Sequence, residues 1–294
     1  MNLPPKPRVV YAQGRFVPIE EASVPIMDRG FLFGDGIYEV TAVLDGKFVD
    51  NEPHLARLER SLSAIGIRNP FSAGQWTALQ RNLVDYNALR EGIVYIQVTR
   101  GVFEREFTCP DEVEPNVVMF TQAKNIRENP SAETGVAVIS TPDLRWARRD
   151  IKSTSLLAQV LAKQEARAAG VAEAWMVEDG MVTEGASSTA FIINARNEIV
   201  TRPLSNAILP GVTRSCVLAL ADEKGLSLAE RPFSIAEAIA AREAFLTSAS
   251  TFVMPVVSID GKTIGDGAPG PLTRQLRKMY FAAIDAERHR ETAE

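Results

Sequence analysis

Two residues in this sequence, Lys152 and Glu184, could together perform the chemistry of an aldehyde cofactor. Lys152 stands in the segment Asp150-Ile151-Lys152-Ser153, and Glu184 stands in Thr183-Glu184-Gly185. A lysine amine can bind an aldehyde as a Schiff base, and a carboxylate can keep a pyridine nitrogen protonated so that the ring withdraws electrons. The pair is therefore the minimum that pyridoxal phosphate (PLP) chemistry requires. By itself it carries little weight, because the chain has eight lysines and most lysines and glutamates are solvated surface residues.

Two further segments could bind a phosphate group. Arg57 lies in His54-Leu55-Ala56-Arg57-Leu58, and a guanidinium can bind phosphate with two parallel hydrogen bonds. Gly211-Val212-Thr213 precedes a predicted helix, whose first N–H groups lie at the positive end of the helix dipole. Each has an ordinary alternative: a helix arginine that faces solvent, and a turn that binds nothing.

Composition excludes several classes of protein. The chain has 294 residues, of which 46% are hydrophobic and 23% charged, as in globular proteins with one large or two modest cores. The net charge of −5 argues against a nucleic-acid-binding surface, and the run Arg145, Arg148 and Arg149 is too short to change that. Two cysteines, Cys109 and Cys216, provide neither a disulfide framework nor a metal-ligand cluster. We therefore expect no metal site.

The sequence also contains no targeting or membrane signal that we recognise. The first seven residues lack an apolar segment of signal-peptide length, and no run of about 18 apolar residues occurs. We therefore expect a cytoplasmic location and no membrane partner.

The first part of the chain predicts an antiparallel sheet with helices packed on one side. Leu55, Leu58, Leu62 and Ile65 form one apolar helical stripe that leaves Arg57 outside it. Strands are expected at residues 8–11, 15–18, 36–44, 93–99 and 117–121, and helices from Asn51 and from Ser72.

The second part predicts a barrel-like or sandwich-like domain. Strands are expected at residues 136–140, 173–177, 190–194, 198–201, 243–247 and 253–259, and helices at 155–169, 212–224 and 272–286. Residues 122–134 are polar and are interpreted as a linker. The predicted organisation is a small N-terminal domain over 1–121, the linker 122–134, and a large domain over 135–294.

Several motifs, in order along the chain, resemble the fold-type IV PLP enzymes. They are Arg29-Gly30-Phe31-Leu32-Phe33-Gly34-Asp35-Gly36-Ile37-Tyr38-Glu39-Val40, Asp150-Ile151-Lys152-Ser153, Lys163-Gln164-Glu165-Ala166, Thr183-Glu184-Gly185 and Leu209-Pro210-Gly211-Val212-Thr213-Arg214. The similarity runs from about Val10 to Tyr280 and is strongest to the D-amino-acid transaminases. It implies an α+β fold, with a small α/β N-terminal domain and a larger pseudo-barrel C-terminal domain that binds PLP.

The resemblance assigns roles to individual residues around the cofactor. Lys152 corresponds to the Schiff-base lysine, which also transfers the proton, and Glu184 to the partner of the pyridine nitrogen. Arg57 corresponds to a phosphate ligand. The remaining expected cofactor contacts are Leu209 against the ring and Gly211, Val212, Thr213, Ser248 and Ser250 at the phosphate. Ala249 replaces the usual threonine of the last loop, so a neighbouring serine hydroxyl would have to substitute for it.

The substrate pocket departs further from the family pattern. Tyr38 and Arg105 correspond to residues that bind the substrate α-carboxylate, but Phe107 stands where a histidine is usual, and Thr189 replaces a common asparagine. The loss of the histidine removes one donor, so carboxylate binding should be weaker or differently arranged.

The resemblance implies a PLP-dependent transaminase that moves the amino group of a D-amino acid to a 2-oxo acid such as 2-oxoglutarate or pyruvate. Ping-pong kinetics and a homodimer are expected with it. The alternatives are an L-branched-chain aminotransferase, a lyase of the aminodeoxychorismate type, and a non-catalytic relative that retains the fold.

Overall fold

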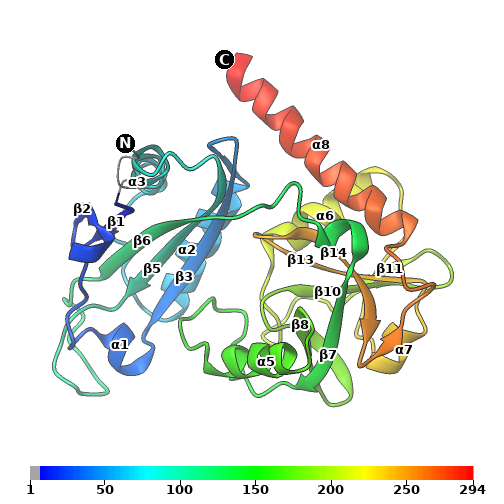
Figure 1. Ribbon diagram of the computed structural model, residues 1–294. Coiled ribbons are helices and arrows are strands. Elements are labelled where there is room, and N and C mark those ends of the chain that lie inside the picture. The colour runs from blue at the N-terminus through cyan, green and yellow to red at the C-terminus, as the bar shows by residue number, and fades with distance from the viewer. Residues whose placement is uncertain (1–6, 294) are drawn as a thin grey trace, which may run out of the picture. The chain divides into compact units, whose positions relative to one another are not determined.

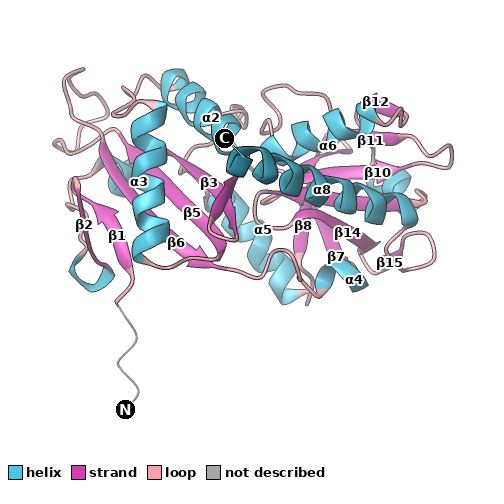
Figure 2. Ribbon diagram, turned by 90° about the horizontal axis from the view of Figure 1, so that it is seen from above, coloured by secondary structure: helices cyan, strands magenta, loops and turns pink. Residues whose placement is uncertain are grey.

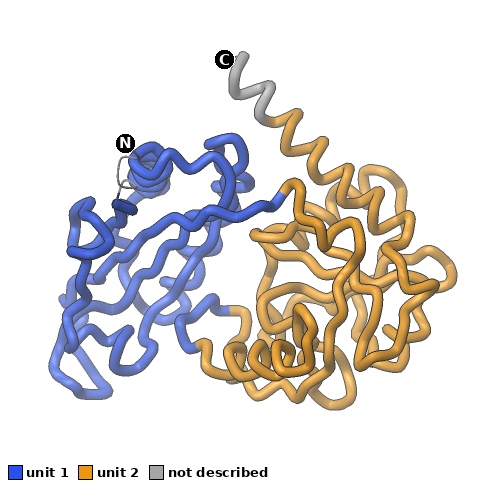
Figure 3. The backbone as a smooth tube through the Cα atoms, viewed as in Figure 1, with its two compact units in different colours: residues 1–126, 151–155 blue, residues 127–150, 156–294 orange. Residues whose placement is uncertain are grey.

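The chain divides into two compact units, which are described separately. A computed structural model describes residues 7–293, with side chains placed for residues 7–287. Unit 1 comprises residues 1–126 and 151–155, and unit 2 comprises residues 127–150 and 156–294 (Figure 3). The first boundary lies inside the segment predicted as a linker. The short segment 151–155, which contains Lys152, groups with unit 1 and not with the domain predicted over 135–294.

Unit 1 is built on a six-stranded antiparallel sheet, and an antiparallel sheet was predicted for this part of the chain. The strand order is β2-β1-β6-β5-β3-β4, and every pairing between neighbours is antiparallel. The strands are β1 (Val9–Ala12), β2 (Arg15–Pro18), β3 (Gly36–Leu44), β4 (Lys47–Val49), β5 (Glu91–Thr99) and β6 (Asn116–Ala123).

Two helices cover one face of this sheet, α2 (Asn51–Ala64) and α3 (Ala73–Tyr86) (Figure 2). Leu55, Leu58 and Leu62 of α2 are buried, which confirms the predicted apolar stripe. Ser72 caps α3 in a reciprocal capping box with Gln75, which explains why the helix begins there. Two shorter elements complete the unit, the 3₁₀ turn η1 (Ile19–Glu21) and α1 (Arg29–Phe33).

Unit 2 is built on a nine-stranded mixed sheet. Its main order is β12-β11-β10-β13-β14-β7-β8-β9, and β15 (Lys262–Thr263) pairs with β14. The other strands are β7 (Val136–Pro142), β8 (Glu173–Glu178), β9 (Met181–Gly185), β10 (Thr189–Ile193), β11 (Ile199–Thr201), β12 (Leu228–Glu230), β13 (Glu243–Ser248) and β14 (Phe252–Ile259). Strands β9 and β10 also contact each other although they are not hydrogen-bonded neighbours, so the sheet curls into the predicted barrel-like form.

Helices pack on this curled sheet (Figure 1). α5 (Leu157–Ala168) packs against β8 and β7, while α6 (Val212–Glu223) and α8 (Pro271–Ala293) contact each other and β13. The short helices α4 (Ser131–Thr134) and α7 (Ile235–Ile239) both contact β14. Among residues 7–293, no helix has the length and apolar character that crossing a bilayer requires.

The sequence did not reveal the shortest elements, including α1, β4, β9, β12 and α7. A helix of five residues such as α1 has too few positions to show a 3.6-residue period. Its ends are instead fixed by local chemistry, because Asp28 accepts a hydrogen bond from the Gly30 N–H and Gly34 ends the helix with a φ of 68°.

Candidate active site

In unit 1, the backbone around Lys152 is fixed against β3. The Tyr38 N–H donates to the Lys152 carbonyl at 2.9 Å, and the Thr154 N–H donates to the Gly36 carbonyl at 2.9 Å. These bonds explain why residues 151–155 group with unit 1, although they lie in the crossover between β7 and β8. The Lys152 Nζ lies 4.2 Å from the centre of the Tyr38 ring, within cation–π range. Two predicted site residues, Lys152 and Tyr38, are thus neighbours.

Arg57 lies in a buried cluster with Glu39 and His54. The Arg57 Nε donates to one oxygen of Glu39 at 2.9 Å and its Nη2 to the other at 2.6 Å, and His54 Nδ1 lies 2.9 Å from the same carboxylate. Burial would raise the pKa of Glu39, but the Arg57 charge and the His54 contact hold it well below its usual range. The two-point contact fixes the plane of the guanidinium.

The Tyr38 ring belongs to a stack of aromatic rings that crosses the sheet. Tyr38 stacks on Tyr95 with 5.7 Å between ring centres, and Tyr95 stacks on Phe120 at 4.6 Å. Burial raises the pKa of the Tyr95 hydroxyl, and the neighbouring Tyr38 raises it further. Tyr38 is therefore held by packing on one side and by its backbone bond to Lys152.

The loop with Arg105 and Phe107 is held to unit 1 by Arg29. The buried Arg29 guanidinium donates to the carbonyls of Glu106, at 2.5 Å, and Phe107, at 3.0 Å. The Arg105 guanidinium lies 5.5 Å from the centre of the Phe33 ring, and the Phe107 ring lies 5.6 Å from Phe33 and is 84% exposed. Within the described residues, no hydrogen bond or ion pair joins Arg105 to Tyr38, and their shared role at a substrate carboxylate stays a prediction.

In unit 2, Glu184 is nearly buried and is fixed by two donors to the same oxygen. The Arg145 guanidinium forms an ion pair with Glu184 Oε1, and the Leu209 N–H donates to Oε1 at 3.1 Å. Glu184 lies near the end of β9, and the Leu209 bond ties the loop before α6 to it. Two predicted cofactor residues, Glu184 and Leu209, are therefore directly connected.

The N-terminus of α6 lies next to a buried group of threonines. Thr189 and Thr247 are directly opposed in the β10–β13 pair, and a Cβ on Gly211 would lie 3.0 Å from the Thr189 hydroxyl oxygen. Thr213 is buried, and no side chain caps this helix. The Thr247 hydroxyl is buried and has no hydrogen-bond partner in the part of the chain that is described.

Ser248 and Ser250 follow directly on β13. The Ser248 hydroxyl lies 3.4 Å from that of Ser250 and 2.8 Å from that of Thr251. The loop is therefore rich in hydroxyls, as the sequence indicated, even though Ala249 has none.

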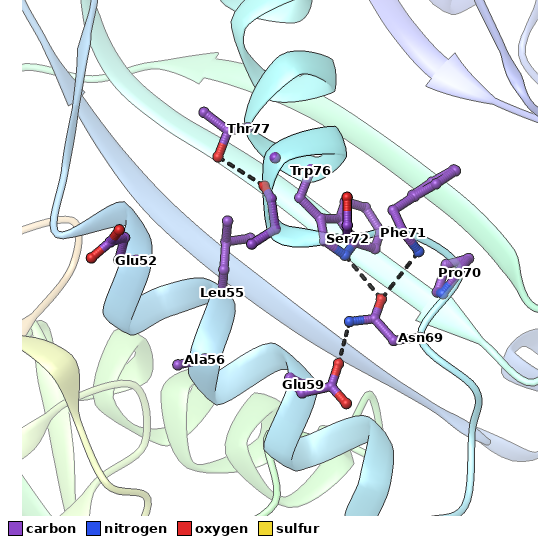
Figure 4. A pocket seen from close by; sticks show the side chains of 12 residues that line it. Glu52, Leu55, Ala56, Glu59, Asn69, Pro70, Phe71, Ser72, Trp76 and Thr77 are labelled. Atoms are coloured by element: carbon purple, nitrogen blue, oxygen red, sulfur yellow. Dashed lines mark hydrogen bonds between the residues drawn. The ribbon is translucent and has the colours of Figure 1, made fainter.

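A pocket of about 830 Å³ lies elsewhere in unit 1, between α2 and the start of α3 (Figure 4). Asn69 links its two sides, because its side chain bonds both Glu59 and the Trp76 indole N–H. None of the predicted site residues lines it. Among residues 7–287, no group of three or more His, Cys, Asp or Glu side chains is arranged to hold a metal ion.

The predicted site residues thus fall into one group in each unit. Unit 1 holds Lys152, Tyr38, Arg57, Arg105 and Phe107, and unit 2 holds the rest. Sequence reasoning did not single out the residues that fix them, namely Glu39, His54, Arg29, Arg145 and Thr247. Glu39 stood inside a quoted motif and Arg145 inside a quoted arginine run, but neither pattern indicates which side chain it contacts.

Comparisons with known proteins identify the family and the fold that the chain shares with them. A sequence model of the family "Amino-transferase class IV" matches residues 36–259. The chain is 41% identical over 278 residues to a D-alanine aminotransferase of Bacillus licheniformis, which covers 95% of this chain and 98% of that protein.

Two solved structures share the fold. The branched-chain amino acid aminotransferase of Escherichia coli superimposes with a TM-score of 0.87 at 22% identity, over 95% of each chain. The branched-chain aminotransferase of Thermoproteus uzoniensis, solved with norvaline, gives a TM-score of 0.81 at 26% identity, over 94% of each chain. The match to the family over three quarters of the sequence, together with the extent of the identity, establishes that this chain belongs to the class IV aminotransferases, a PLP-dependent family.

Proposed function

We propose that this protein is a PLP-dependent transaminase that moves the amino group of a D-amino acid to a 2-oxo acid, with 2-oxoglutarate or pyruvate as acceptor. The observation that carries the choice of D-amino acids is the 41% identity, over nearly the whole chain, to a protein named D-alanine aminotransferase. The early motif Tyr38-Glu39-Val40 and the segment around Lys152 support the same choice.

The residues present fit PLP. The cofactor has an aldehyde, a pyridine nitrogen and a phosphate, which need an amine, a buried carboxylate and a set of anion-binding donors. Lys152 lies beside an aromatic ring, and Glu184 is a nearly buried carboxylate. Thr247 supplies a buried hydroxyl that lacks a partner among the described residues, close to the uncapped start of α6. Each need of the cofactor therefore has a matching group.

Lys152 would hold the cofactor covalently, and Glu184 would hold its pyridine nitrogen. Leu209 would lie against the ring. Arg57, the α6 start at Gly211, Val212 and Thr213, and the hydroxyls of Ser248 and Ser250 would hold the phosphate. When bound, PLP supplies an electron sink that makes the Cα proton of an amino acid acidic.

The chain's own groups would do the rest of the chemistry. The Lys152 amine, once displaced by the substrate amine, would take the proton from Cα as a general base and donate a proton to the cofactor's aldehyde carbon, C4′, as a general acid. Glu184, kept ionised, would hold a proton on the ring nitrogen. Tyr38 and Arg105 would bind the substrate carboxylate, and Phe107 would present an apolar wall where a histidine donor is usual.

The defining experiment measures product formation from D-alanine and from L-alanine in one coupled assay, with 2-oxoglutarate as acceptor. Wild-type protein should consume D-alanine and leave L-alanine, and Lys152→Ala should consume neither. Borohydride reduction followed by peptide mapping should locate the cofactor on Lys152. Consumption of L-alanine alone, or labelling of another lysine, would contradict the proposal.

One alternative substrate has its own support. The fold is shared with branched-chain amino acid aminotransferases, so L-leucine and L-valine belong in the same assay. Faster turnover of these L-amino acids than of D-alanine would favour that alternative. A lyase of the aminodeoxychorismate type would instead turn over none of these amino acids and would release pyruvate from aminodeoxychorismate by elimination, without a 2-oxo acid acceptor.

The assembly and location are proposed from the family resemblance. We infer a homodimer, which light scattering on purified protein would test, and a cytoplasmic location, which fractionation of the source cells would test. Small amino acids and 2-oxo acids are then the expected partners, without nucleic acid or membrane.

A further inference from the structure

Five charged side chains of alternating sign form one continuous series in unit 2. Glu184 pairs with Arg145, and Arg145 pairs with Asp143 at 2.7 Å. Arg149 then reaches Asp143 at 3.3 Å and Glu178 at 2.6 Å. We call this the charge series. It includes Arg145 and Arg149, two members of the arginine run that is too short to form a nucleic-acid-binding surface.

The charge series is buried except at one end. The side chains of Glu184, Arg145, Asp143 and Arg149 are between 0% and 6% exposed, whereas Glu178 is 39% exposed. Charges this deep in a protein are tolerated only when each has a partner. Burial would lower the pKa of Arg145, but Asp143 and Glu184 raise it above its ordinary value. Arg145 is therefore a permanent cation.

The surrounding structure holds Arg145 in one position. Its Nε and Nη2 donate to the two oxygens of Asp143, at 3.0 and 2.7 Å. Asp143 in turn accepts from the Thr183 hydroxyl at 2.6 Å, and its N–H donates to the Val177 carbonyl at 2.8 Å. Because Nε and Nη2 donate to Asp143, the contact of Arg145 with Glu184 is made by Nη1. Asp143 thus aims Arg145 at the carboxylate.

The charges in the series do not balance. Three carboxylates and two guanidiniums leave one negative charge, and both ends of the series are carboxylates. Water can screen the charge of the half-exposed Glu178. Glu184 is only 5% exposed, so water screens its charge far less than that of Glu178.

We propose that Arg145, held by Asp143, is a positioning residue that keeps Glu184 ionised and so places the shared proton on the cofactor's ring nitrogen. The inference rests on the proposed function. In a hydrogen bond between a carboxyl group and a pyridine, the proton can sit on the oxygen or on the nitrogen. A guanidinium on the carboxylate stabilises the charged arrangement, because opposite charges interact strongly at low exposure. Without Arg145 the proton should move to Glu184, which leaves the ring neutral and weakens its electron withdrawal.

The test uses full-length protein, stripped of cofactor and reloaded with PLP that carries ¹⁵N at the ring nitrogen. The ¹⁵N chemical shift reports whether that nitrogen holds a proton, independently of activity. Wild type should give the protonated shift, and Glu184→Gln should give the unprotonated one. The ¹⁵N chemical shift of Arg145→Gln should differ from that of wild type by at least half of the difference between wild type and Glu184→Gln. The dissociation constant of the Arg145→Gln variant for PLP should rise about tenfold, which corresponds to about 1.4 kcal/mol.

Two further variants separate positioning from general damage. Arg148→Gln removes a half-exposed arginine of the same run, which forms its ion pair with Asp150 outside the charge series, and should leave both the shift and the PLP affinity unchanged. If Arg145→Gln leaves Asp143 too poorly paired to fold, the double variant Asp143→Asn with Arg145→Gln removes both charges and should show the same shift.

The role of Arg145 and the role of Glu184 are contradicted by different results. A wild-type shift in the Arg145 variants, with the expected change in Glu184→Gln, overturns the role of Arg145 and leaves the proposed function intact. A wild-type shift in Glu184→Gln removes Glu184 from the ring nitrogen and overturns this inference, whereas the proposed function fails only if the protein does not transaminate D-alanine.

Discussion

Single residues in this protein act through the partners that orient them. Arg57 is the clearest case in unit 1, because Glu39 holds its guanidinium through two hydrogen bonds and His54 contacts the same carboxylate. A guanidinium fixed in this way loses little freedom when it binds an anion. If Arg57 binds the cofactor phosphate, as proposed, Glu39 would contribute to that binding without touching the phosphate.

Glu39→Gln should weaken the binding of PLP more than that of pyridoxal, which has no phosphate. The change leaves Arg57 buried without its counter-charge, so stability should also fall by about 3 kcal/mol. Equilibrium titration of cofactor-free protein gives the two dissociation constants. The ratio of the constant for pyridoxal to the constant for PLP should fall about tenfold. Arg57→Ala serves as the reference and Gln80→Leu as the buried control, since Gln80 has an oxygen without a partner among the described residues. An unchanged ratio in Glu39→Gln, with a changed one in Arg57→Ala, would show that Glu39 only stabilises the fold.

Arg105→Ala should raise KM for D-alanine far more than for a primary amine that lacks a carboxylate. A charged, hydrogen-bonded guanidinium–carboxylate contact contributes about 1.5–3 kcal/mol, or roughly 10- to 150-fold in KM. Arg105 is exposed, lies over the Phe33 ring and forms no hydrogen bond or ion pair within the described residues, so its removal should leave the melting temperature unchanged. Steady-state kinetics with both substrates measures the difference. Equal losses for the two would mean that Arg105 does not recognise the carboxylate.

At the scale of elements, a few backbone positions decide whether the site loops can form. Gly101 begins the loop with Arg105 and has a φ of 111°, and a Cβ there would lie 2.0 Å from the Glu114 carbonyl oxygen. Its own carbonyl accepts from the Arg29 N–H at 2.9 Å. The position therefore joins α1 to the loop that follows β5.

Gly101→Ala should destabilise unit 1 by about 2–4 kcal/mol, because it combines an unfavourable φ with a contact against rigid backbone. Gly74→Ala is the matched control: it lies in the first turn of α3 with nothing within 4 Å, and alanine there should stabilise the helix by about 0.5–1 kcal/mol. Urea unfolding of both variants measures the change. A stability of Gly101→Ala equal to that of wild type would show that the loop shifts freely, and Arg105 would then have no fixed position.

Across the whole molecule, each unit buries a carboxylate that must stay ionised. Glu39 in unit 1 has its pKa held low by Arg57 and His54 against the effect of burial. Asp143 in unit 2 has its pKa lowered in the same way by Arg145 and Thr183. In the unfolded chain such groups bind protons near pH 4.

The stability of wild type should therefore be nearly constant from about pH 7 to pH 5 and should fall as the pH drops below about 4. The sign follows from proton binding. Below that pH the carboxylates bind more protons in the unfolded chain than in the folded protein, where their pKa is lower, so acid favours unfolding. Glu39→Gln should start less stable at pH 7 but lose less stability between pH 4 and pH 2. Urea denaturation at each pH provides the comparison, and parallel curves for the two proteins would contradict it.

The sequence by itself determined the helices and strands that are long enough to repeat a pattern, and the residues whose types suit the chemistry of the cofactor. The stripe of Leu55, Leu58 and Leu62 predicted α2, and the strand expected at residues 36–44 is β3, because both patterns are local in the chain. The motifs around Lys152 and Glu184 indicated the family, and the family match confirms it. Short elements such as α1 and β9 were missed because they repeat no pattern.

Only the tertiary structure decided which residues support the chemical ones. The pairing of Glu39 with Arg57 spans 18 positions, and that of Arg145 with Glu184 spans 39. Segment 151–155 joined unit 1 through backbone bonds to β3, against the prediction of a continuous second domain. Contacts between distant segments depend on how whole sheets fold. The local sequence around a buried arginine does not distinguish it from an exposed one. The sequence therefore identifies the reactive side chains, whereas tertiary packing decides which residues contact and orient them.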